Sequence, residues 1–554
     1  MSKTSLILGL SLMLSAVTAV AANPKQAPNP YESASRPTMG CKIDRIVFAK
    51  LSSLDIKPVL CSDAVFVRRV YLDVIGTLPT AEEAWKFIND PNRKNKRRIL
   101  IDQLLERDEF ADYWSMKWGD ILRIKAEFPI NLWPNAAQAY HRWVRASIAE
   151  NKPYDQFVRE MLTSSGSNFR VGPVNFYRAI QNKTPEGIAT TVALTFMGTR
   201  TDSWTKDRLA GTAIFFSQIG YKPTSEWKEE HVFWNPLGSA LPPGSTAPGQ
   251  AAIKTSAPVA DEKSKLPVTP AAPLVGVFPD GKKVEIPPNQ DPREVFADWL
   301  ITPENPWYTK SIVNRVWAWL MGRGIIHEPD DIREANPPSN PELLSYLQKE
   351  FINSGYDLKH LYRLILTSNV YQLSSIPRQD SQEARANFAS YPLRRLEAEV
   401  LIDAVNKITG TSDLYTSAIP EPFTYIPKDL PAIALADGSI TSPFLALFGR
   451  SARATGMENE RDNKPVPAQW LHMLNSSHIQ SKLEQGPALK EIFMSRKPPA
   501  EIVKALYLTI LSRPPTQEEF KTILEFVKST RSRREAAVDI SWALINSPEF
   551  LYRH

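Results

Sequence analysis

Two adjacent carboxylates, Asp330 and Asp331, are the first residues in the sequence that could do chemistry. They follow an apolar, Trp-rich segment that contains Arg315 and ends near Arg323. Arg333 comes two residues later. Paired carboxylates can do acid/base work if their surroundings drive their pKa values apart. The same residues could equally cap a turn and pair with the arginines, so the pattern leaves both interpretations open.

A second charged cluster lies on a Gly-punctuated loop before a predicted helix. Loops that carry dense polar groups are common places for function. Arginines there suit recognition of a carboxylate, sulfate or phosphate, although a solvated surface has a similar composition. Together the two clusters supply the candidate catalytic residues Asp330, Asp331, Glu458 and Glu460. The candidate ligand-binding residues are Arg315, Arg323, Arg333, Arg450, Arg453, Arg461, Gln469 and His472.

Three polar residues lie within apolar helical segments and are predicted to be structural. Arg69 and Asp73 are spaced i, i+4, which predicts an ion pair across one helical turn. Asn314 lies beside Arg315 in the apolar segment 312–320.

Common catalytic and cofactor signatures are absent from the sequence. It has no Gly-x-Ser-x-Gly elbow, no Gly-rich phosphate loop and no His-Glu-x-x-His. His472 and His478 lie six residues apart, which on a helix is not one face. The sequence therefore predicts no metal site and no cofactor. A weaker alternative is a redox protein with noncovalent haem, whose axial ligand would come from His141, His231, His327, His472 or His478.

The N-terminus is typical of a secretory signal peptide, predicted over residues 1–21. Lys3 is followed by an uncharged apolar run from Leu6 to Val20 and a small-x-small cleavage site. The run is shorter than the roughly 20 residues of a membrane span, and no later transmembrane segment is predicted. We therefore expect an exported protein of the periplasm or cell surface, with residues 22–40 as a disordered lead-in.

The two cysteines, Cys41 and Cys61, are predicted to form a disulfide. Export would place them in an oxidising compartment, where a pair tends to join. The bridge would close a loop of roughly 20 residues and stabilise the fold by about 3 kcal/mol in the chain-entropy model. Two buried free thiols are the alternative.

The chain is weakly basic, with 66 basic and 60 acidic residues and a net charge of +6. These charges are interspersed, and the densest basic runs, at 93–98 and 531–534, each precede or enter a predicted helix. Solvated helix faces explain such runs better than nucleic acid does, because nucleic-acid binding favours a basic stripe with aromatic partners. No nucleic-acid partner is predicted.

Hydrophobic periodicity predicts a mainly α protein of two helical domains. Helical patterns fill 41–222, for example at Phe110, Trp114 and Trp118 on one face. Prolines then dominate 223–290, which predicts a linker that ends in a small β-hairpin with an Asp-Gly turn. Helical patterns return over 291–554.

Six segments resemble a pair of domains found together in exported planctomycete-type proteins. The family consists of domains of unknown function fifteen-forty-nine and fifteen-fifty-three, and it is cytochrome-associated. The matching segments are FVRRVYLDVIGTLPT at 66–80, WGDILR at 118–123, NRVWAWLMGRGI at 314–325, DDIREANPPSNPELL at 330–344, RRLEAEVLIDAVNKITG at 394–410 and SWALINSPEFLYRH at 541–554.

The resemblance implies a cell-envelope role linked to polysaccharide use, but not a reaction. Many relatives carry a Cys-x-x-Cys-His haem-attachment stretch just after the position of Gly198, and here Thr199–Ser203 leads straight on to Trp204. Relatives also tend to have Cys-Glu-Cys-Glu-Arg where this chain has residues 457–461, MENER. We infer that both motifs serve one metal or haem centre and that this member has dispensed with it.

Two functions from different classes follow from the sequence. The first is a cofactor-free binding or scaffold protein, with an anionic polysaccharide or an envelope protein as its partner. The second is an enzyme that acts on a glycan through the candidate carboxylates. Carboxylates about 5–9.5 Å apart in one cleft would favour the enzyme, and carboxylates locked in ion pairs with Arg315, Arg333 and Arg461 would favour the binding protein.

Overall fold

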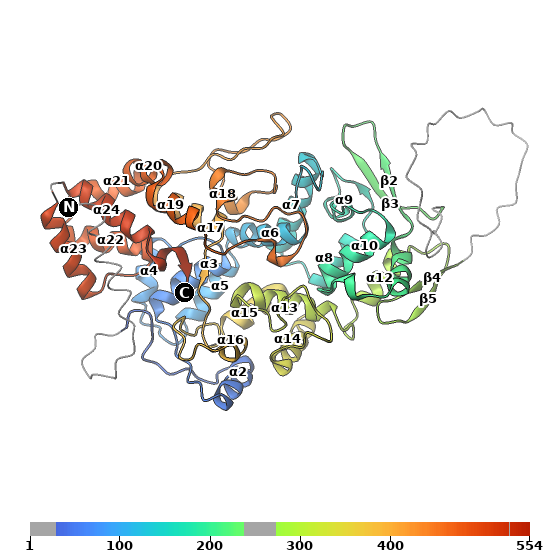
Figure 1. Cartoon of the computed structure of the whole chain (residues 1–554), viewed down its shortest axis with the longest axis horizontal. Coiled ribbons are helices and arrows are strands. Elements are labelled where there is room, and N and C mark those ends of the chain that lie inside the picture. Colours follow the sequence, from blue (N-terminus) through green and yellow to red (C-terminus); the bar gives the residue numbers. More distant parts are fainter. Residues whose placement is uncertain (1–28, 238–272, 531) are drawn as a thin grey trace, which may run out of the picture.

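The computed structural model describes residues 29–237, 273–530 and 532–554 of the chain. The predicted signal peptide, most of the predicted linker and Arg531 lie outside these residues. The protein is elongated and mainly helical, with helices α19 to α24 at one end and the strands β2 to β5 at the other (Figure 1). The predicted fold class is therefore confirmed.

The first helical region begins after the lead-in and ends before the strand β2. Its helices are α2 (Lys42–Ser53), α3 (Asp63–Val74), α4 (Ala81–Ile88), α5 (Lys96–Leu105), α6 (Asp108–Ile121), α7 (Pro134–Ala149), α8 (Tyr154–Thr163), α9 (Asn175–Arg178), α10 (Pro185–Val192) and α11 (Lys206–Ala213).

The second helical region follows the strand β5. Its helices are α12 (Pro292–Leu300), α13 (Tyr308–Met321), α14 (Pro341–Asn353), α15 (Leu358–Leu366), α16 (Gln382–Ala386), α17 (Ala398–Thr409), α18 (Pro443–Leu447), α19 (Pro467–Asn475), α20 (Ser477–Gln485), α21 (Pro487–Met494), α22 (Pro499–Leu511), α23 (Gln517–Ser529), α24 (Arg533–Ile545) and α25 (Pro548–Leu551).

Local signals in the sequence set the ends of several helices. Asn340 caps α14 by accepting a hydrogen bond from the backbone N–H of Leu343 at 3.0 Å. Thr516 and Glu519 form the reciprocal capping box of α23. Gly410 ends α17 in the left-handed conformation. Asp155, a residue type that often caps helices, lies instead in the first turn of α8, whose N-cap is Pro153.

The strands form three small antiparallel sheets. β3 (Glu230–Trp234) lies between β1 (Gly166–Ser167) and β2 (Ile219–Pro223). β4 (Leu274–Val277) and β5 (Lys283–Ile286) form the predicted hairpin, in which Gly281 turns the chain at φ 90°. β6 (Arg394–Arg395) pairs with β7 (Tyr552–Arg553). Part of the predicted linker is therefore ordered strand.

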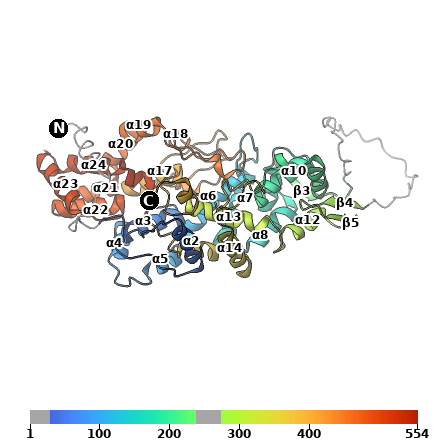
Figure 2. The ribbon, with the colours of Figure 1, turned by 60° about the horizontal axis from the view of Figure 1, so that its bottom comes forward.

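The two helical regions share one hydrophobic core. α2 contacts α14, α4 contacts α22, and α5 contacts α15, so helices of the first region pack against helices of the second (Figure 2). Trp319 of α13 lies between Trp114 and Trp118 of α6, with ring centroids 5.5 and 5.8 Å away. Because all three indoles are buried, separating the two regions would expose apolar core surface of each region to water.

The C-terminal strand closes a buried polar cluster around α3. Asp73 accepts a hydrogen bond from Arg553 at 2.8 Å and lies 3.6 Å from Arg394. Arg69 instead donates to the backbone oxygens of His554 and Tyr371. The predicted ion pair between Arg69 and Asp73 is therefore wrong, because burial gives each side chain a partner far away in sequence.

The predicted disulfide does not form, since Cys41 and Cys61 are both free. Cys41 is the N-cap residue of α2, where burial raises the pKa of its thiol to about 12. Cys61 is buried, and its backbone oxygen accepts a hydrogen bond from Arg97 of α5 at 2.9 Å. The Sγ of Cys61 lies 4.0 Å from Nη1 of Arg97, so the two thiols have different surroundings.

The lead-in is partly ordered, against the prediction of disorder over residues 22–40. From Asn29 onward the chain runs beside the segment that contains Cys61, with Glu32 and Cys61 bridged. Glu32 also pairs with Arg378 at 2.7 Å. The described part of the lead-in is therefore tied to both helical regions.

Among the residues that the structure describes, no helix has the length and apolarity needed to cross a membrane.

Replacing Arg553 with Ala should lower the free energy of unfolding by about 3–5 kcal/mol. The change leaves the buried carboxylates of Asp73 and Glu397 without their shared cation, and such a loss is strongly destabilising. Chemical denaturation checks this. Arg533→Ala, at an exposed position of α24, is the matched control. Equal stability of the two variants would contradict the stabilising role of Arg553 between Asp73 and Glu397.

Thiol titration of the denatured protein without reductant should find two reactive thiols per chain. In the native protein both should react slowly, because Cys61 is buried and the thiol of Cys41 has a raised pKa. If no thiol reacts after denaturation, the two cysteines form a disulfide and the free-thiol assignment is wrong.

Candidate functional site

The first candidate cluster lies where the two helical regions meet. Arg315, fully buried in α13, donates to Asp330 at 2.7 Å and to the backbone oxygens of Leu194 and Thr195. The other carboxylate oxygen of Asp330 accepts the backbone N–H of Glu458 at 2.7 Å. Asp330 thus joins α13 and the second cluster, and both of its carboxylate oxygens are bonded within the protein.

The segments 198–203 and 457–461, where the resemblance implies cysteines in relatives, both contact the stretch 330–332. The backbone N–H of Ile332 donates to the oxygen of Gly198 at 2.8 Å, and the hydroxyl of Thr199 donates back to Ile332. Glu458, in the other segment, bonds to Asp330. The two segments, far apart in sequence, therefore converge on one short stretch of chain.

The residues at this junction do not fit an attached haem. Covalent attachment needs two cysteine thiols, and residues 198–204 and 457–461 contain none. Among the described residues, no group of three or more His, Cys, Asp or Glu side chains is arranged to hold a metal ion.

The three arginines of the second cluster are enclosed in a buried ionic network. Arg461 pairs with both Asp120 of α6 and Glu399 of α17, and Arg450 pairs with Glu399 at 3.1 Å. Arg453 donates to Asp120 at 3.0 Å. All three guanidinium groups are therefore engaged by the protein itself, which makes them structural.

Two glycines let Arg453 reach this network. A Cβ added at Gly119 would lie 2.9 Å from the Arg453 guanidinium carbon, and one added at Gly438 would lie 2.8 Å from its Cδ. The side chain therefore passes between α6 and the segment around Gly438, where only glycine leaves room.

The remaining candidate carboxylates do not form a catalytic pair. Asp331 pairs with the exposed Arg333 at 3.1 Å. Glu460 accepts the backbone N–H groups of Ala454 and Thr455 and so holds its own loop. Glu458 keeps a half-buried carboxylate whose pKa is raised, first by burial and then by the neighbouring Asp330 and Glu328.

The other predicted residues, apart from Arg323, have structural contacts. Asn314 binds Ile326 through both its amide atoms. Gln469 donates to the backbone oxygen of Leu447 at 3.0 Å. Nε of Arg323 is buried without a hydrogen-bond partner. Among the histidines, His141 contacts Ser115, and burial lowers its pKa to about 3.

His472 belongs to a polar groove together with His478, which the sequence had also singled out, and with Asp413 and Lys482, which it had not. Its Nε2 lies 3.3 Å from Nδ1 of His478, and Nε2 of His478 lies 2.8 Å from a carboxylate oxygen of Asp413. Lys482 lies 3.4 Å from the other oxygen of Asp413. The groove has a volume of ≈ 770 Å³ between α20 and the segment 411–414.

The spacing of residues on α20 explains how the groove is built. His478 and Lys482 are one turn apart and both reach Asp413, whose pKa burial would raise but His478 and Lys482 lower. The next row along the helix, Ser477, Ser481 and Gln485, lines the groove and is exposed. That i, i+4, i+8 row was visible in the sequence.

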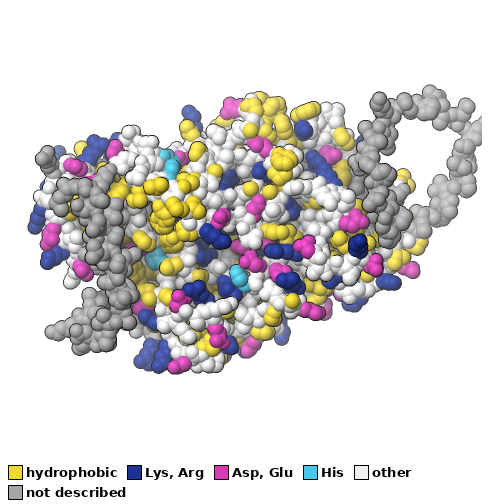
Figure 3. All heavy atoms as spheres, viewed as in Figure 1, with side chains coloured by type: hydrophobic (Ala, Val, Ile, Leu, Met, Phe, Trp, Pro, Cys, Tyr) yellow, Lys and Arg dark blue, Asp and Glu magenta, His cyan; other side chains and the backbone are white. Residues whose placement is uncertain are grey.

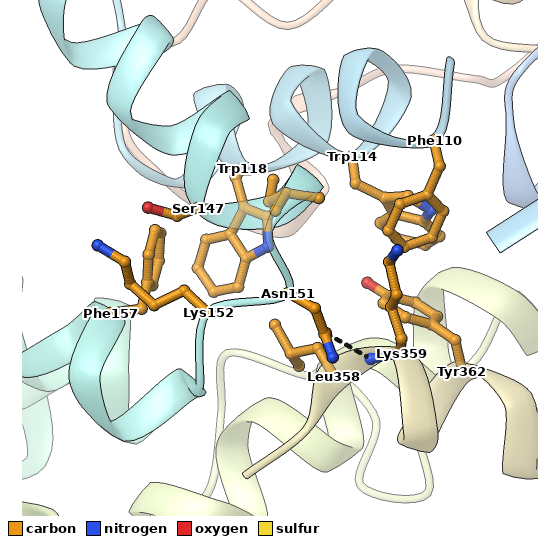
Figure 4. A pocket seen from close by; sticks show the side chains of 11 residues that line it. Phe110, Trp114, Trp118, Ser147, Asn151, Lys152, Phe157, Leu358, Lys359 and Tyr362 are labelled. Atoms are coloured by element: carbon orange, nitrogen blue, oxygen red, sulfur yellow. Dashed lines mark hydrogen bonds between the residues drawn. The ribbon is translucent and has the colours of Figure 1, made fainter. Parts of the chain in front are cut away.

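The tryptophan-rich cavity between the two regions is a packing defect rather than a ligand site. Rings of α6 surround it, together with Tyr362 and Phe157 (Figure 4). Its volume is ≈ 20 Å³, about the room for one water molecule. Asn151 spans its rim by accepting the backbone N–H of Lys359 at 3.2 Å.

The fold and junction define a class: a helical protein of two regions that share one core and are joined by a buried ionic network. Residues 42–209 match the family described as PSCyt2, protein of unknown function (DUF1549). Residues 292–527 match PSD1, protein of unknown function (DUF1553). The chain belongs to the family with this domain pair, as the resemblance indicated. No curated protein and no solved structure matches it.

The buried network makes stability depend on acid pH through Glu399. The two arginines outweigh burial and hold the pKa of Glu399 at about 2. Because that value lies below the one in the unfolded chain, ionised Glu399 stabilises the fold above about pH 4.3. This contribution, on the order of 3 kcal/mol, is lost as the pH falls towards 2.

Denaturation of the wild type and Glu399→Gln at several pH values checks this. The variant should be less stable at pH 7, because Arg450 and Arg461 lose a carboxylate, and its stability should fall less steeply below pH 4.3. Glu484→Gln, at an exposed position, is the control. Parallel curves for the wild type and Glu399→Gln would contradict the assignment.

Proposed function

We propose that this protein is an exported cell-envelope protein that binds a polysaccharide in the groove between α20 and the segment 411–414. The main support for this proposal is a row of polar side chains on α20 that have no protein partner and face an open groove. The arginines first considered for binding an anionic chain are enclosed in ion pairs, so the proposal rests on hydroxyl and amide groups instead.

The groove offers the contacts that a sugar ring requires. Ser477, Ser481 and Gln485 are exposed and line the groove, and their side chains carry donors and acceptors with no protein partner in the described structure. Leu414 lies on the other wall and is 71% exposed. Sugar hydroxyls can bond to the first set while an apolar C–H face covers the second, which removes apolar surface from water.

Binding without hydrolysis is the better-supported version of this function. Glycoside hydrolysis uses two carboxylates on either side of the scissile bond, and the groove contains one, Asp413. Asp413 is already engaged by His478 and Lys482. Glu458 has a raised pKa but belongs to the junction, where its neighbour Asp330 is paired with Arg315 and its neighbour Glu328 lies 3.6 Å from His327.

The junction supports an earlier proposal about this family member. Both segments that carry cysteines in relatives bind 330–332, which supports a single centre served by both. In this chain ion pairs and backbone hydrogen bonds hold the junction instead. We infer that the member keeps the architecture of that centre as a structural joint.

Binding of neutral oligosaccharides to the mature protein tests the proposal by array screening and calorimetry. Ser481→Trp should weaken binding at least tenfold, because the indole fills the groove. Glu484→Trp, on the same helix but outside the groove, should bind like the wild type. Unchanged ligand size after long incubation would match binding without turnover.

Two outcomes would overturn this function. One is the absence of any oligosaccharide that binds the wild type. The other is binding that Ser481→Trp and Glu484→Trp weaken equally.

A further inference from the structure

A second pocket, far along the chain from the glycan groove, is lined by an excess of positive charge. Its volume is ≈ 540 Å³. Five of its lining residues are basic, and one, Asp63, is acidic. The basic residues are Arg93, Lys94, Lys96, Arg97 and Arg98.

Two of the five basic residues are fixed at the base of the pocket. Lys96 is buried and donates to one oxygen of Asp63 and to the backbone oxygens of Phe87 and Ile88. Arg97 donates to the other oxygen of Asp63 at 2.9 Å, to Cys61 and to Gln372. One carboxylate is therefore shared by two immobile cations, which leaves the base of the pocket positive.

The other three basic residues lie at the rim without an acidic partner in the described structure. Arg93, Lys94 and Arg98 are exposed, and they line the same pocket as the fixed pair. Like charges held this close repel one another. The N-terminus of α5, which starts at Lys96, adds to this field because no side chain caps it.

Neutral hydrogen-bonding groups complete the walls. Ser33 and Ser35 come from the lead-in, and Thr367 and Gln372 come from the second helical region. The pocket is thus assembled from three parts of the chain, and it combines cationic donors with hydroxyls. That combination suits an oxyanion with several acceptor oxygens.

We propose that this pocket is a binding site for a tetrahedral oxyanion, a sulfate or phosphate group. The group would bond to Arg93, Lys94 and Arg98 and take up the uncompensated charge at the base. This site is separate from the glycan groove and does not depend on the function proposed for it. The anion relieves the repulsion among the basic side chains, so binding should also stabilise the folded protein.

Calorimetry and thermal unfolding with sodium sulfate, sodium phosphate and sodium chloride at equal ionic strength test the proposal. Sulfate or phosphate should bind and raise the unfolding temperature, and chloride should not. The double variant Lys94→Ala/Arg98→Ala should weaken oxyanion binding at least tenfold. Both side chains are exposed, so the variant should fold, and circular dichroism checks that it does.

A matched control and a second series of ligands complete the experiment. Lys521→Ala/Lys528→Ala removes two exposed charges from α23 and should leave oxyanion binding unchanged, as should Ser481→Trp. A sulfated disaccharide that binds more tightly than inorganic sulfate would identify a sulfated glycan as the source, and equal binding a free anion. Equal effects of sulfate and chloride, or equal losses in the two double variants, would overturn the site.

Discussion

Two buried carboxylates at the start of α17 hold the protein together. Glu397 pairs with Lys117 of α6 and with Arg553 of the C-terminal strand. Glu399 pairs with Arg450 and Arg461, and Arg461 returns to Asp120 of α6. Because buried charges are tolerable only when paired, removing any one partner leaves a charge that the others cannot compensate. The joint between the two regions is therefore specified by charge as well as by apolar packing.

This joint explains why the residues that looked most functional are structural. Arginines and carboxylates clustered on a loop are equally suited to a ligand and to one another, and here they bind one another. Polar groups without internal partners lie elsewhere, on the exposed row of α20 and around the N-terminus of α5. In Figure 3 acidic and basic side chains are interspersed over the visible face, so unpaired polar rows identify sites better than charge density does.

Structural features that depend on residues close together in the chain could be predicted from the sequence. The apolar face of α6 and the hairpin of β4 and β5 depend on neighbours in the chain, and they form as predicted. Partners far apart in sequence could not be predicted. The spacing of Arg69 and Asp73 predicted an ion pair between them, whereas in the folded protein Asp73 pairs with Arg553. The disulfide between Cys41 and Cys61 was predicted from the oxidising compartment expected after export. In the structure the two side chains have different surroundings, and both are free.

The pairing of β7 with β6, and of the last residues with α3, constrains the order in which the chain can fold. The guanidinium groups of Arg68 and Arg69 need the backbone oxygens of Phe550 and His554. A ribosome delivers α3 long before those oxygens. Until they emerge, each of these two buried guanidinium groups lacks one of its native acceptors. The native hydrogen bonding of α3 is therefore complete only after residues 550–554 are in place, although α3 itself lies near the beginning of the chain.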